Sequence, residues 1–407
     1  MSEYRRGEVR RSMKIAYVVP RYGLEVLGGA ELGARMLAER LVSMLGWEVE
    51  VLTTCALDAR SWADEYPPGE VLVNGVRVRR FRSLTGRDPG FEAFSAQVLP
   101  APETASAATG ERWIDLQGPV CPDVVDAAAD SDADLTVFYP YLYYPTVRGV
   151  KAVGDRAVMH PAAHDEPPLR LPLFREVFAS TAGFVFQTDA ERRLVESRFP
   201  VAHRPQLLMG LGVEPRPGDV EAARRSLHLG PEPYLLCLGR VDDGKGTALL
   251  ARFFAAFKDR RPGPLKLVYV GPVIHPLPAH PDVIVTGPVD EEMKWGILRG
   301  ALALVSPAPL EAFSLAVMEA WSAGLPVLVN AACQPTSEHV RRSSGGLCFG
   351  SYAMFEVAVE RLVGDDRLRA GLAERGGAYA VANYSWPVLI ERYRRFLEML
   401  ADRRRKG

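Results

Sequence analysis

Two carboxylates, Glu311 and Glu319, are the residues whose types and spacing most clearly suggest chemistry. An apolar run at 302–307 precedes Glu311, and Gly324 follows Glu319 before the next apolar run. This order predicts a buried strand, a loop, a helix that ends at glycine, and a second strand. Glu311 would then lie at the carboxyl end of a strand, and Glu319 about two turns along the helix. Ligands bind at this edge of an open α/β sheet, so both carboxylates are candidates for ligand contacts.

A second candidate site is a glycine-rich, basic loop at 239–247, directly after a predicted strand. Glycine lets a backbone approach a ligand closely, and the helix that follows would offer free N–H groups. Arg240 supplies a planar fork of donors and Lys245 a point charge, so the loop suits a diphosphate. The alternative is a solvated turn in which these cations pair with Asp242 and Asp243. The glycine spacing differs from that of a Walker A loop.

The N-terminal half offers weaker signals. Gly28 and Gly29 precede the first predicted helix. They indicate either an ordinary turn or a loop whose N–H groups contact a phosphate or an acceptor. His160 and His164 follow a predicted strand, and a histidine there can donate a hydrogen bond to a ligand. We favour His164 for that role and a structural role for His160, although the sequence leaves open which of them faces a donor.

Composition and charge exclude several classes of protein. A net charge of −1 over 407 residues argues against a dedicated nucleic-acid binder. Five scattered cysteines without a CxxC pair indicate reduced thiols in a cytoplasmic protein and no zinc site. His164, Asp165 and Glu166 are metal-ligand types, but no further histidine or cysteine cluster supports them, so we expect no metal. No apolar run approaches the roughly 18 residues of a membrane span.

Strand-like runs alternate with helical patterns in two series, which are joined by a proline-containing link. This alternation predicts parallel sheets covered on both faces. We therefore expect an α/β protein with two doubly wound, Rossmann-like domains facing across a cleft. The domains would span 13–211 and 212–385, with a last amphipathic helix at 386–402. The polar stretch 1–12 is expected to be a disordered leader.

Three regions carry no pattern that assigns a function. The segment 85–119 is rich in glycine, proline, alanine and serine without periodicity, and we interpret it as an irregular insertion. The tyrosines at 139–144 indicate core packing or, alternatively, the lining of an acceptor pocket. The basic tail at 403–406 indicates a solvated terminus or, alternatively, peripheral association with the inner face of a membrane.

These motifs together resemble the GT-B glycosyltransferases of the GT4 family, also called glycosyl transferases group 1. The resemblance rests on the loop at 239–246, the pair Glu311 and Glu319, and the glycine and proline at 324–327, with weaker matches at 28–31 and around His164. It covers 13 to about 401. A typical member has Glu-Gly-Phe-Gly where this chain has Glu-Ala-Phe-Ser, a difference that concerns the closeness of approach to a phosphate.

The resemblance implies a role for each motif residue. Arg240 and Lys245 would neutralise the donor diphosphate, and Glu311 would contact the sugar hydroxyls. Glu319 would hold the ribose, and His164 would hydrogen-bond the transferred sugar near its reacting carbon. The implied catalytic residues are His164, Glu311, Arg240 and Lys245. The implied donor-binding residues are Gly28, Gly29, Gly239, Arg240, Lys245, Val289, Glu311, Phe313, Ser314, Leu315 and Glu319.

The resemblance also implies an activity and an assignment of the domains. The first domain would face the acceptor, the second would bind the nucleotide sugar, and the last helix would pack back on the first domain. The enzyme would move a sugar from a nucleotide-diphospho-sugar, expected to be a UDP- or GDP-sugar, to the hydroxyl of a glycan, glycolipid or natural product. Transfer would retain the anomeric configuration and need neither a metal nor a cofactor.

Two alternative activities stay open on the same fold. One is a nucleotide-sugar 2-epimerase-like isomerase, against which the spacing of Glu311 and Glu319 argues. The other is a nucleotide-sugar-binding protein that has lost catalysis, against which the intact Arg240 and Lys245 argue. A dehydrogenase would need a GxGxxG turn after a strand, and neither domain begins with one.

Overall fold

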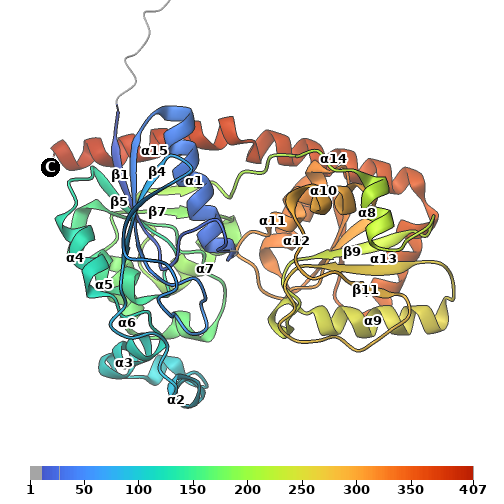
Figure 1. The fold of residues 1–407 in the computed structure, drawn as a ribbon, viewed down its shortest axis with the longest axis horizontal. Helices are drawn as coiled ribbons and strands as arrows, with labels where there is room; N and C mark the ends of the chain where they lie inside the picture. Colours follow the sequence, from blue (N-terminus) through green and yellow to red (C-terminus); the bar gives the residue numbers. More distant parts are fainter. Residues whose placement is uncertain (1–11, 27, 407) are drawn as a thin grey trace, which may run out of the picture. The chain divides into compact units, whose positions relative to one another are not determined.

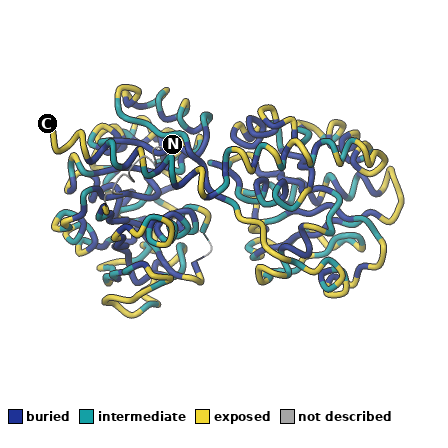
Figure 2. The backbone as a smooth tube through the Cα atoms, turned by 90° about the horizontal axis from the view of Figure 1, so that it is seen from above, coloured by how far each residue is buried: buried dark blue, intermediate teal, exposed yellow. Residues whose placement is uncertain are grey.

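The computed structural model describes residues 12–26 and 28–406, so the expected leader lies outside the described residues except for Ser12. The chain forms two compact units (Figure 1). The N-terminal unit comprises the residues up to Phe186, Arg193–Leu208 and Ile390 onward. The C-terminal unit comprises Gln187–Arg192 and Met209–Leu389. Buried backbone is concentrated in the interior of each unit (Figure 2).

The N-terminal unit is built on an eight-stranded sheet of order β3-β4-β2-β1-β5-β6-β7-β8, in which only β3 runs antiparallel to its neighbour. The central strands β1 and β5 are buried almost throughout, as expected for a parallel sheet covered on both faces. Strand order reverses between β1 and β5, so the loops after these two strands flank the switch point at which ligands bind. The strands are β1 (Lys14–Val18), β2 (Glu48–Thr54), β3 (Gly69–Val73), β4 (Val76–Phe81), β5 (Leu135–Phe138), β6 (Ala157–Met159), β7 (Gly183–Phe186) and β8 (Gln206–Leu208).

We predicted that the segment 85–119 is irregular. This prediction was wrong, because the segment is largely helical. It holds α2 (Phe91–Val98) and α3 (Ala107–Gln117), joined by a short 3-10 turn (Figure 1). Ser106 caps α3 by accepting a hydrogen bond from the Thr109 N–H. Trp113 is buried against Phe91, with ring centroids 5.2 Å apart. Small residues and prolines hide this helical pair from the sequence pattern, and the aromatic contact holds it together.

The other helices of the N-terminal unit cover its sheet, and the last helix belongs to the same unit from Ile390 onward. Tyr393 of that helix anchors it, because its hydroxyl lies 3.0 Å from the Tyr17 hydroxyl and 2.9 Å from Nε2 of His160. The helices are α1 (Gly29–Leu45), α4 (Pro122–Asp130), α5 (Tyr144–Val153), α6 (Leu173–Ala179), α7 (Asp189–Arg198) and α15 (Trp386–Lys406).

The C-terminal unit is built on a six-stranded parallel sheet of order β11-β10-β9-β12-β13-β14. Strand order reverses between β9 and β12, which makes the loops after these strands the second switch point. With both sheets doubly wound, the predicted fold class of two Rossmann-like α/β domains is confirmed. The strands are β9 (Tyr234–Leu238), β10 (Lys266–Val270), β11 (Val283–Val285), β12 (Ala303–Ser306), β13 (Val327–Asn330) and β14 (Gly346–Phe349).

Helices on both faces bury the sheet of the C-terminal unit. Its core includes Leu235, Leu267 and Leu328 from the strands and Phe254 and Phe355 from the helices. The helices are α8 (Val220–Ser226), α9 (Thr247–Arg260), α10 (Glu291–Gly300), α11 (Leu315–Ser322), α12 (Gln334–Ser343), α13 (Tyr352–Gly364) and α14 (Asp366–Tyr384). Within the described residues, no helix combines the length and the apolar character that crossing a membrane requires.

Candidate active site

The loop between β9 and α9 is shaped to leave backbone accessible at the switch point. Gly239 has φ of 132°, and a Cβ built there would meet nothing within 4 Å. Gly246 has φ of 68°, and its Cβ would lie 2.6 Å from the carbonyl oxygen of Pro307, at the end of β12. Glycine at 246 therefore lets the loops after β9 and β12 approach each other closely. The Asp242 carboxylate accepts a hydrogen bond from the Lys245 N–H at 2.7 Å and fixes the turn.

Lys245 and Glu311 join the two predicted motifs. Nζ of Lys245 lies 2.7 Å from Oε1 of Glu311, and the two side chains are 32% and 19% exposed. Arg240 is 61% exposed, and its Nε lies 3.2 Å from Asp242. The pairing expected of a solvated turn thus holds for Arg240, whereas the ammonium of Lys245 turns toward the loop after β12. The Lys245–Glu311 ion pair and the exposed Arg240 therefore lie at the same edge of the sheet.

Aromatic side chains packed against Phe313 hold the loop at 311–314 in place. Phe313 is buried against His339 and Tyr384, with ring centroids 5.2 and 5.1 Å apart. Burial lowers the pKa of His339 to about 3, so this ring is neutral at ordinary pH. The Ala312 carbonyl accepts a hydrogen bond from the Thr188 hydroxyl at 3.1 Å. These contacts fix where the loop backbone points.

Ser314 takes a backbone conformation that glycine adopts more easily. Its φ is 75°, it is buried, and α11 begins at the next residue, Leu315. The Ser314 side chain makes no capping hydrogen bond to the helix. Ser314 therefore adopts the left-handed backbone conformation with some steric strain, whereas glycine would adopt it without that strain. The predicted loop-to-helix transition is present at this position.

Glu319 lies in α11 and is largely enclosed, with a side chain 18% exposed. Burial raises the pKa of this carboxyl, and the neighbouring ammonium of Lys294, 2.9 Å away, opposes that rise. Lys294 belongs to α10, which follows a turn at Gly287, where φ is 72°. Val289 lies in that turn and is half-buried. Helix α10 thus links the two candidates, because Val289 lies just before this helix and Glu319 contacts its Lys294.

In the N-terminal unit, Gly28 and Gly29 differ in what they face. A Cβ at Gly28 would lie 2.1 Å from Oε2 of Glu31, which receives Nε of Arg21 on its other oxygen at 3.0 Å. A side chain at position 28 would therefore displace the carboxylate of the Arg21–Glu31 ion pair. A Cβ at Gly29 would meet nothing within 4 Å. Tyr143 follows β5. Burial raises the pKa of its hydroxyl to about 12, and the nearby carboxylate of Glu31 adds to this rise.

The two candidate histidines have different environments. His160 is buried, is hydrogen-bonded to Tyr393, and has its pKa lowered by burial to about 3. His164 is 34% exposed, and its Nε2 lies 3.4 Å from a carboxylate oxygen of Glu166. The other oxygen of Glu166 accepts a hydrogen bond from the Tyr141 hydroxyl at 2.8 Å. His164 is thus the accessible histidine of the pair, held by an oriented carboxylate.

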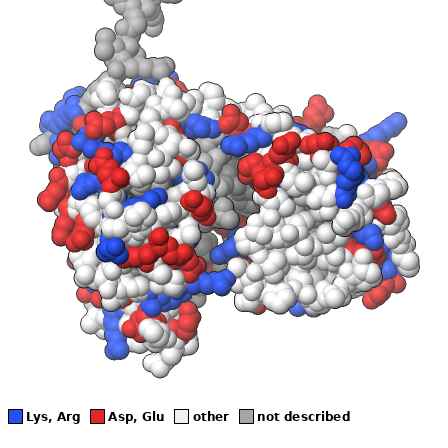
Figure 3. Space-filling view, in the orientation of Figure 1, with Lys and Arg blue, Asp and Glu red and all other residues white. Residues whose placement is uncertain are grey.

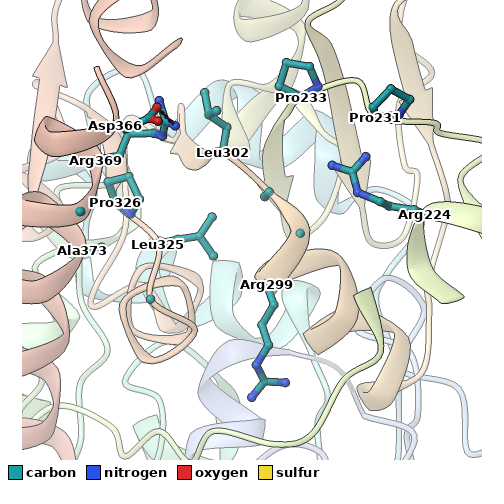
Figure 4. Close-up of a pocket in the computed structure, with 14 residues that line it drawn as sticks. Arg224, Pro231, Pro233, Arg299, Leu302, Leu325, Pro326, Asp366, Arg369 and Ala373 are labelled. Atoms are coloured by element: carbon teal, nitrogen blue, oxygen red, sulfur yellow. Dashed lines mark hydrogen bonds and ion pairs between the residues drawn. The ribbon is translucent and has the colours of Figure 1, made fainter. Parts of the chain in front are cut away.

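A cavity of about 390 Å³ in the C-terminal unit does not coincide with any predicted site residue. Pro233, Leu302 and Pro326 line it, and they directly precede β9, β12 and β13, so it lies at the amino ends of these strands. The guanidinium groups of Arg224 and Arg299 lie on different sides of this cavity (Figure 4). The donor-binding candidates of this unit lie toward the opposite, carboxyl ends of the strands, in the segments that follow them.

Charged and metal-ligating side chains also occur outside the predicted site. On the face seen in Figure 3, acidic and basic side chains are interspersed over the N-terminal unit, whereas those of the C-terminal unit lie mainly around its edge. Among the described residues, no group of three or more histidine, cysteine, aspartate or glutamate side chains is placed to hold a metal ion.

Sequence reasoning missed the residues that hold the motif side chains in place. They are Thr188, Lys294, His339 and Tyr384 in the C-terminal unit, and Arg21, Glu31, Tyr141 and Glu166 in the N-terminal unit. Most of these residues lie far in the sequence from the side chains that they contact, so no local sequence pattern predicts them. Only the spacing of Glu31 after Gly28 and of Glu166 after His164 offered a signal.

Comparisons with known proteins place this chain among sequences and structures that resemble it. Residues 219–378 match the family model "Glycosyl transferases group 1". D-inositol 3-phosphate glycosyltransferase of Frankia alni is 28% identical over 378 residues, which cover 85% of this chain and 88% of that protein. The enzyme of the same name from Nocardia farcinica is 32% identical over 190 residues, 42% of each chain.

Solved structures show the same fold. Sucrose-phosphate synthase from Thermosynechococcus elongatus superposes with a TM-score of 0.70 at 17% identity, covering 95% of this chain and 99% of that one. The Anabaena protein HepE, solved in complex with UDP and glucose, superposes with a TM-score of 0.69 at 16% identity, covering 95% and 100%. These superpositions show the GT-B fold, and the family match at 219–378, together with the similarity to named glycosyltransferases, identifies the chain as a glycosyltransferase.

Proposed function

We propose that this enzyme transfers a sugar from a nucleoside-diphospho-sugar to an acceptor hydroxyl, with retention of configuration and without a metal or cofactor. The observation that carries the proposal is the contact between Lys245 and Glu311 at the β9/β12 switch point, beside the exposed Arg240. This arrangement combines cations for a diphosphate with a carboxylate for sugar hydroxyls. Ligand sites of open α/β sheets lie at such a point.

The donor would lie along the carboxyl ends of the C-terminal strands. Arg240 and Lys245 would bind the diphosphate, and the N–H groups at 313–315 would add donors at the start of α11. Glu311 would accept hydrogen bonds from the sugar, and Glu319 from the ribose. Main-chain groups around Val289 would contact the base. A UDP-sugar is our first candidate and a GDP-sugar the second, because HepE has been solved with UDP-glucose.

The chemical step needs stabilisation of a leaving group more than a protein nucleophile. The bond between the anomeric carbon and the diphosphate oxygen breaks with its electron pair on the diphosphate. The acceptor oxygen bonds to the same face of the sugar, and its proton passes to the departing phosphate. Arg240 and Lys245 neutralise the charge that develops on this phosphate, and a preorganised positive site is worth most there. His164 would hydrogen-bond the transferred sugar. Because the departing phosphate takes the proton, neither Glu311 nor Glu319 would act as a proton-transfer catalyst.

The acceptor would bind in the N-terminal unit, near the loops after β1 and β5. Arg21, Glu31 and Tyr143 gather there and offer donors and acceptors for a hydroxylated molecule. A glycan, glycolipid or natural product would suit this chemistry. Because the relatives are named for D-inositol 3-phosphate, that compound is the first acceptor to try.

A cytoplasmic location fits the ion pairs made by two arginines of the basic tail. Arg404 in the basic tail lies 3.3 Å from Asp155, and Arg405 contacts Asp134. Charges that are already paired attract an anionic membrane surface less than free ones. We therefore prefer a cytoplasmic enzyme over a peripheral membrane protein.

A thermal-shift screen with UDP-, GDP-, ADP- and TDP-sugars tests the donor assignment. The true donor should raise the melting temperature most, because a ligand of the native state stabilises it by mass action. Product formed from that donor should carry the donor's anomeric configuration by NMR, and its yield should persist in excess EDTA.

Three results would count against the proposal. Loss of transfer in EDTA, restored by Mg²⁺, would overturn metal independence. An inverted product would overturn retention. Conversion of the nucleotide sugar without any acceptor would favour the epimerase-like alternative.

A further inference from the structure

The cavity at the amino ends of β9, β12 and β13 is rich in positive charge. The described residues that line it include three arginines, Arg224, Arg299 and Arg369, and one carboxylate, that of Asp366. Arg369 and Asp366 lie together on one side of the cavity, and the guanidinium groups of Arg224 and Arg299 lie on two other sides (Figure 4). The lining thus carries a formal excess of two positive charges. Like charges around one cavity repel each other, and an anion between them would relieve this repulsion.

Arg224 is oriented by the backbone and keeps one edge of its guanidinium available. Its Nη1 donates hydrogen bonds to the carbonyl oxygens of Gly230 at 2.6 Å and Glu232 at 3.2 Å. Its guanidinium carbon lies 5.6 Å from the centroid of the Tyr234 ring. Among the described residues, Nε and Nη2 of Arg224 have no hydrogen-bond partner and the side chain pairs with no carboxylate. The edge formed by Nε and Nη2 is a fork with which arginine binds phosphate or carboxylate in a bidentate way.

The other two arginines differ in how firmly they are held. Arg299, in the last turn of α10, is exposed, and its guanidinium carbon lies 5.5 Å from the centroid of the Trp295 ring. Within the described part of the chain it makes no hydrogen bond or ion pair, so it can turn toward a ligand without losing one. Arg369 contacts Asp366 and donates to the Leu362 carbonyl at 2.6 Å, which fixes its position.

The rest of the cavity wall is apolar and offers few backbone donors. The N–H groups of Leu302 and Leu325 already bond the carbonyl oxygens of Tyr234 and Ala320, both at 2.8 Å. Prolines, which have no N–H group, supply further parts of the wall, at Pro231, Pro233 and Pro326. A ligand here would therefore be held by guanidinium groups at a charged end and by apolar contacts along its body.

We propose that this cavity binds a phosphate monoester, whose phosphate is held by the free edge of Arg224 while Arg299 and Arg369 supply further positive charge. A phosphate monoester carries about −1.5 to −2 charges at pH 7, which matches the excess charge of the lining. The volume of about 390 Å³ falls in the range of small-molecule sites and leaves room for an organic body beside the phosphate. Because the cavity lies at the strand ends opposite the proposed donor site, this inference does not rest on the proposed function.

Phenyl phosphate is a suitable probe, because it joins a phosphate monoester to a small apolar ring. Calorimetry should detect its binding to the wild type even in saturating UDP, which would fill the donor site. Arg224→Met should weaken this binding on the order of tenfold or more, since a charged hydrogen-bonded contact is lost. Arg299→Met should weaken it severalfold. Its side chain makes no hydrogen bond among the described residues, so this variant decides the question if Arg224→Met does not fold.

Arg225→Met is the matched control. Arg225 is the next residue of the same helix α8, is exposed, and does not line the cavity. We expect its affinity for phenyl phosphate to stay within about twofold of the wild type, because an exposed charge outside the cavity contributes little. Lys245→Ala, at the donor loop, should likewise bind phenyl phosphate as the wild type does.

Inorganic phosphate distinguishes the two sources of this anion. Weaker binding of inorganic phosphate than of phenyl phosphate would support an ester, whereas equal binding would overturn the ester and leave a site for free phosphate. The proposal is overturned altogether if the wild type binds neither anion at millimolar concentration, or if Arg224→Met and Arg299→Met both bind like the wild type. Loss of binding in Lys245→Ala would place the anion at the donor loop and overturn it as well. Failure of UDP to bind the wild type would count against the proposed function alone.

Discussion

Lys245 and Glu311 show how single residues define this site. Each is the charged residue of a separate loop, and their contact at 2.7 Å couples the loop after β9 to the loop after β12. Arg240 is more exposed than either of them, at 61%, so its side chain has room to turn toward a ligand. If the donor diphosphate binds as we propose, it would replace Glu311 as the ionic partner of Lys245.

Lys245→Ala should lower kcat/KM by about 100-fold or more, because the site loses a preorganised positive group at the leaving phosphate. The melting temperature of the ligand-free protein should change little, since the pair is partly exposed. Lys151→Ala is the control, because Lys151 is also a partly exposed lysine in an ion pair, with Glu176. Near-normal turnover in Lys245→Ala, with the true donor saturating, would show that the diphosphate binds elsewhere.

The loop at 311–314 and helix α11 act together at the scale of the element. Phe313 is buried under the loop, the Thr188 hydroxyl holds a carbonyl, and Ser314 turns the chain into the helix with φ of 75°. The backbone N–H groups of the turn are thereby fixed in direction before any ligand arrives. Strain at Ser314 is the cost of that rigidity.

Ser314→Gly should raise the free energy of unfolding by up to about 1 kcal/mol, because relief of backbone strain exceeds the added entropy of the unfolded chain. Ser314→Ala should be nearly neutral, since the hydroxyl makes no capping bond. Ser314→Val should destabilise the protein, because β-branched residues tolerate positive φ poorly. Urea denaturation of the three variants measures the effect. Equal stability of the glycine and valine variants would show that the turn is not strained.

Much of this site could be predicted from the sequence, and the remainder could not, for physical reasons. The position of Glu311 after a buried strand, and of Lys245 in a glycine-rich turn, are local patterns that fix the edge of a sheet. The partners Lys294 and His339 lie 25 and 26 residues from Glu319 and Phe313, respectively, and depend on how helices pack. The helical pair α2 and α3 was missed because its apolar stripe is narrow and interrupted by small residues.

At the scale of the whole molecule, each unit contains one deeply buried neutral histidine. His160 in the N-terminal unit bonds Tyr393, and His339 in the C-terminal unit lies against Phe313 and bonds Tyr379. Burial lowers the pKa of both to about 3. Both units should therefore respond to acid in the same way.

The stability from His160 should be fully present above pH 6.5 and be lost as the pH falls toward 3. In that window the unfolded chain takes up a proton that the native ring refuses, which costs up to about 1.4 kcal/mol per pH unit. His160→Gln keeps a partner for Tyr393 and removes the titration, so its urea midpoint should fall less steeply with pH. His203→Gln, at an exposed position, is the control. Identical pH profiles for the wild type and His160→Gln would contradict a neutral buried histidine.

The division of the chain between the units has a consequence for biosynthesis. The N-terminal unit is completed only by the residues from Ile390 onward, after about 180 residues of the C-terminal unit have been made. At 5–20 residues per second, the ribosome takes roughly 10 to 40 s over that stretch. During this time Tyr17 and His160 lack the helix that carries Tyr393 and covers them. The first half of this enzyme to emerge is thus the last to be finished, and its uncovered apolar surface is a natural target for chaperones that bind nascent chains.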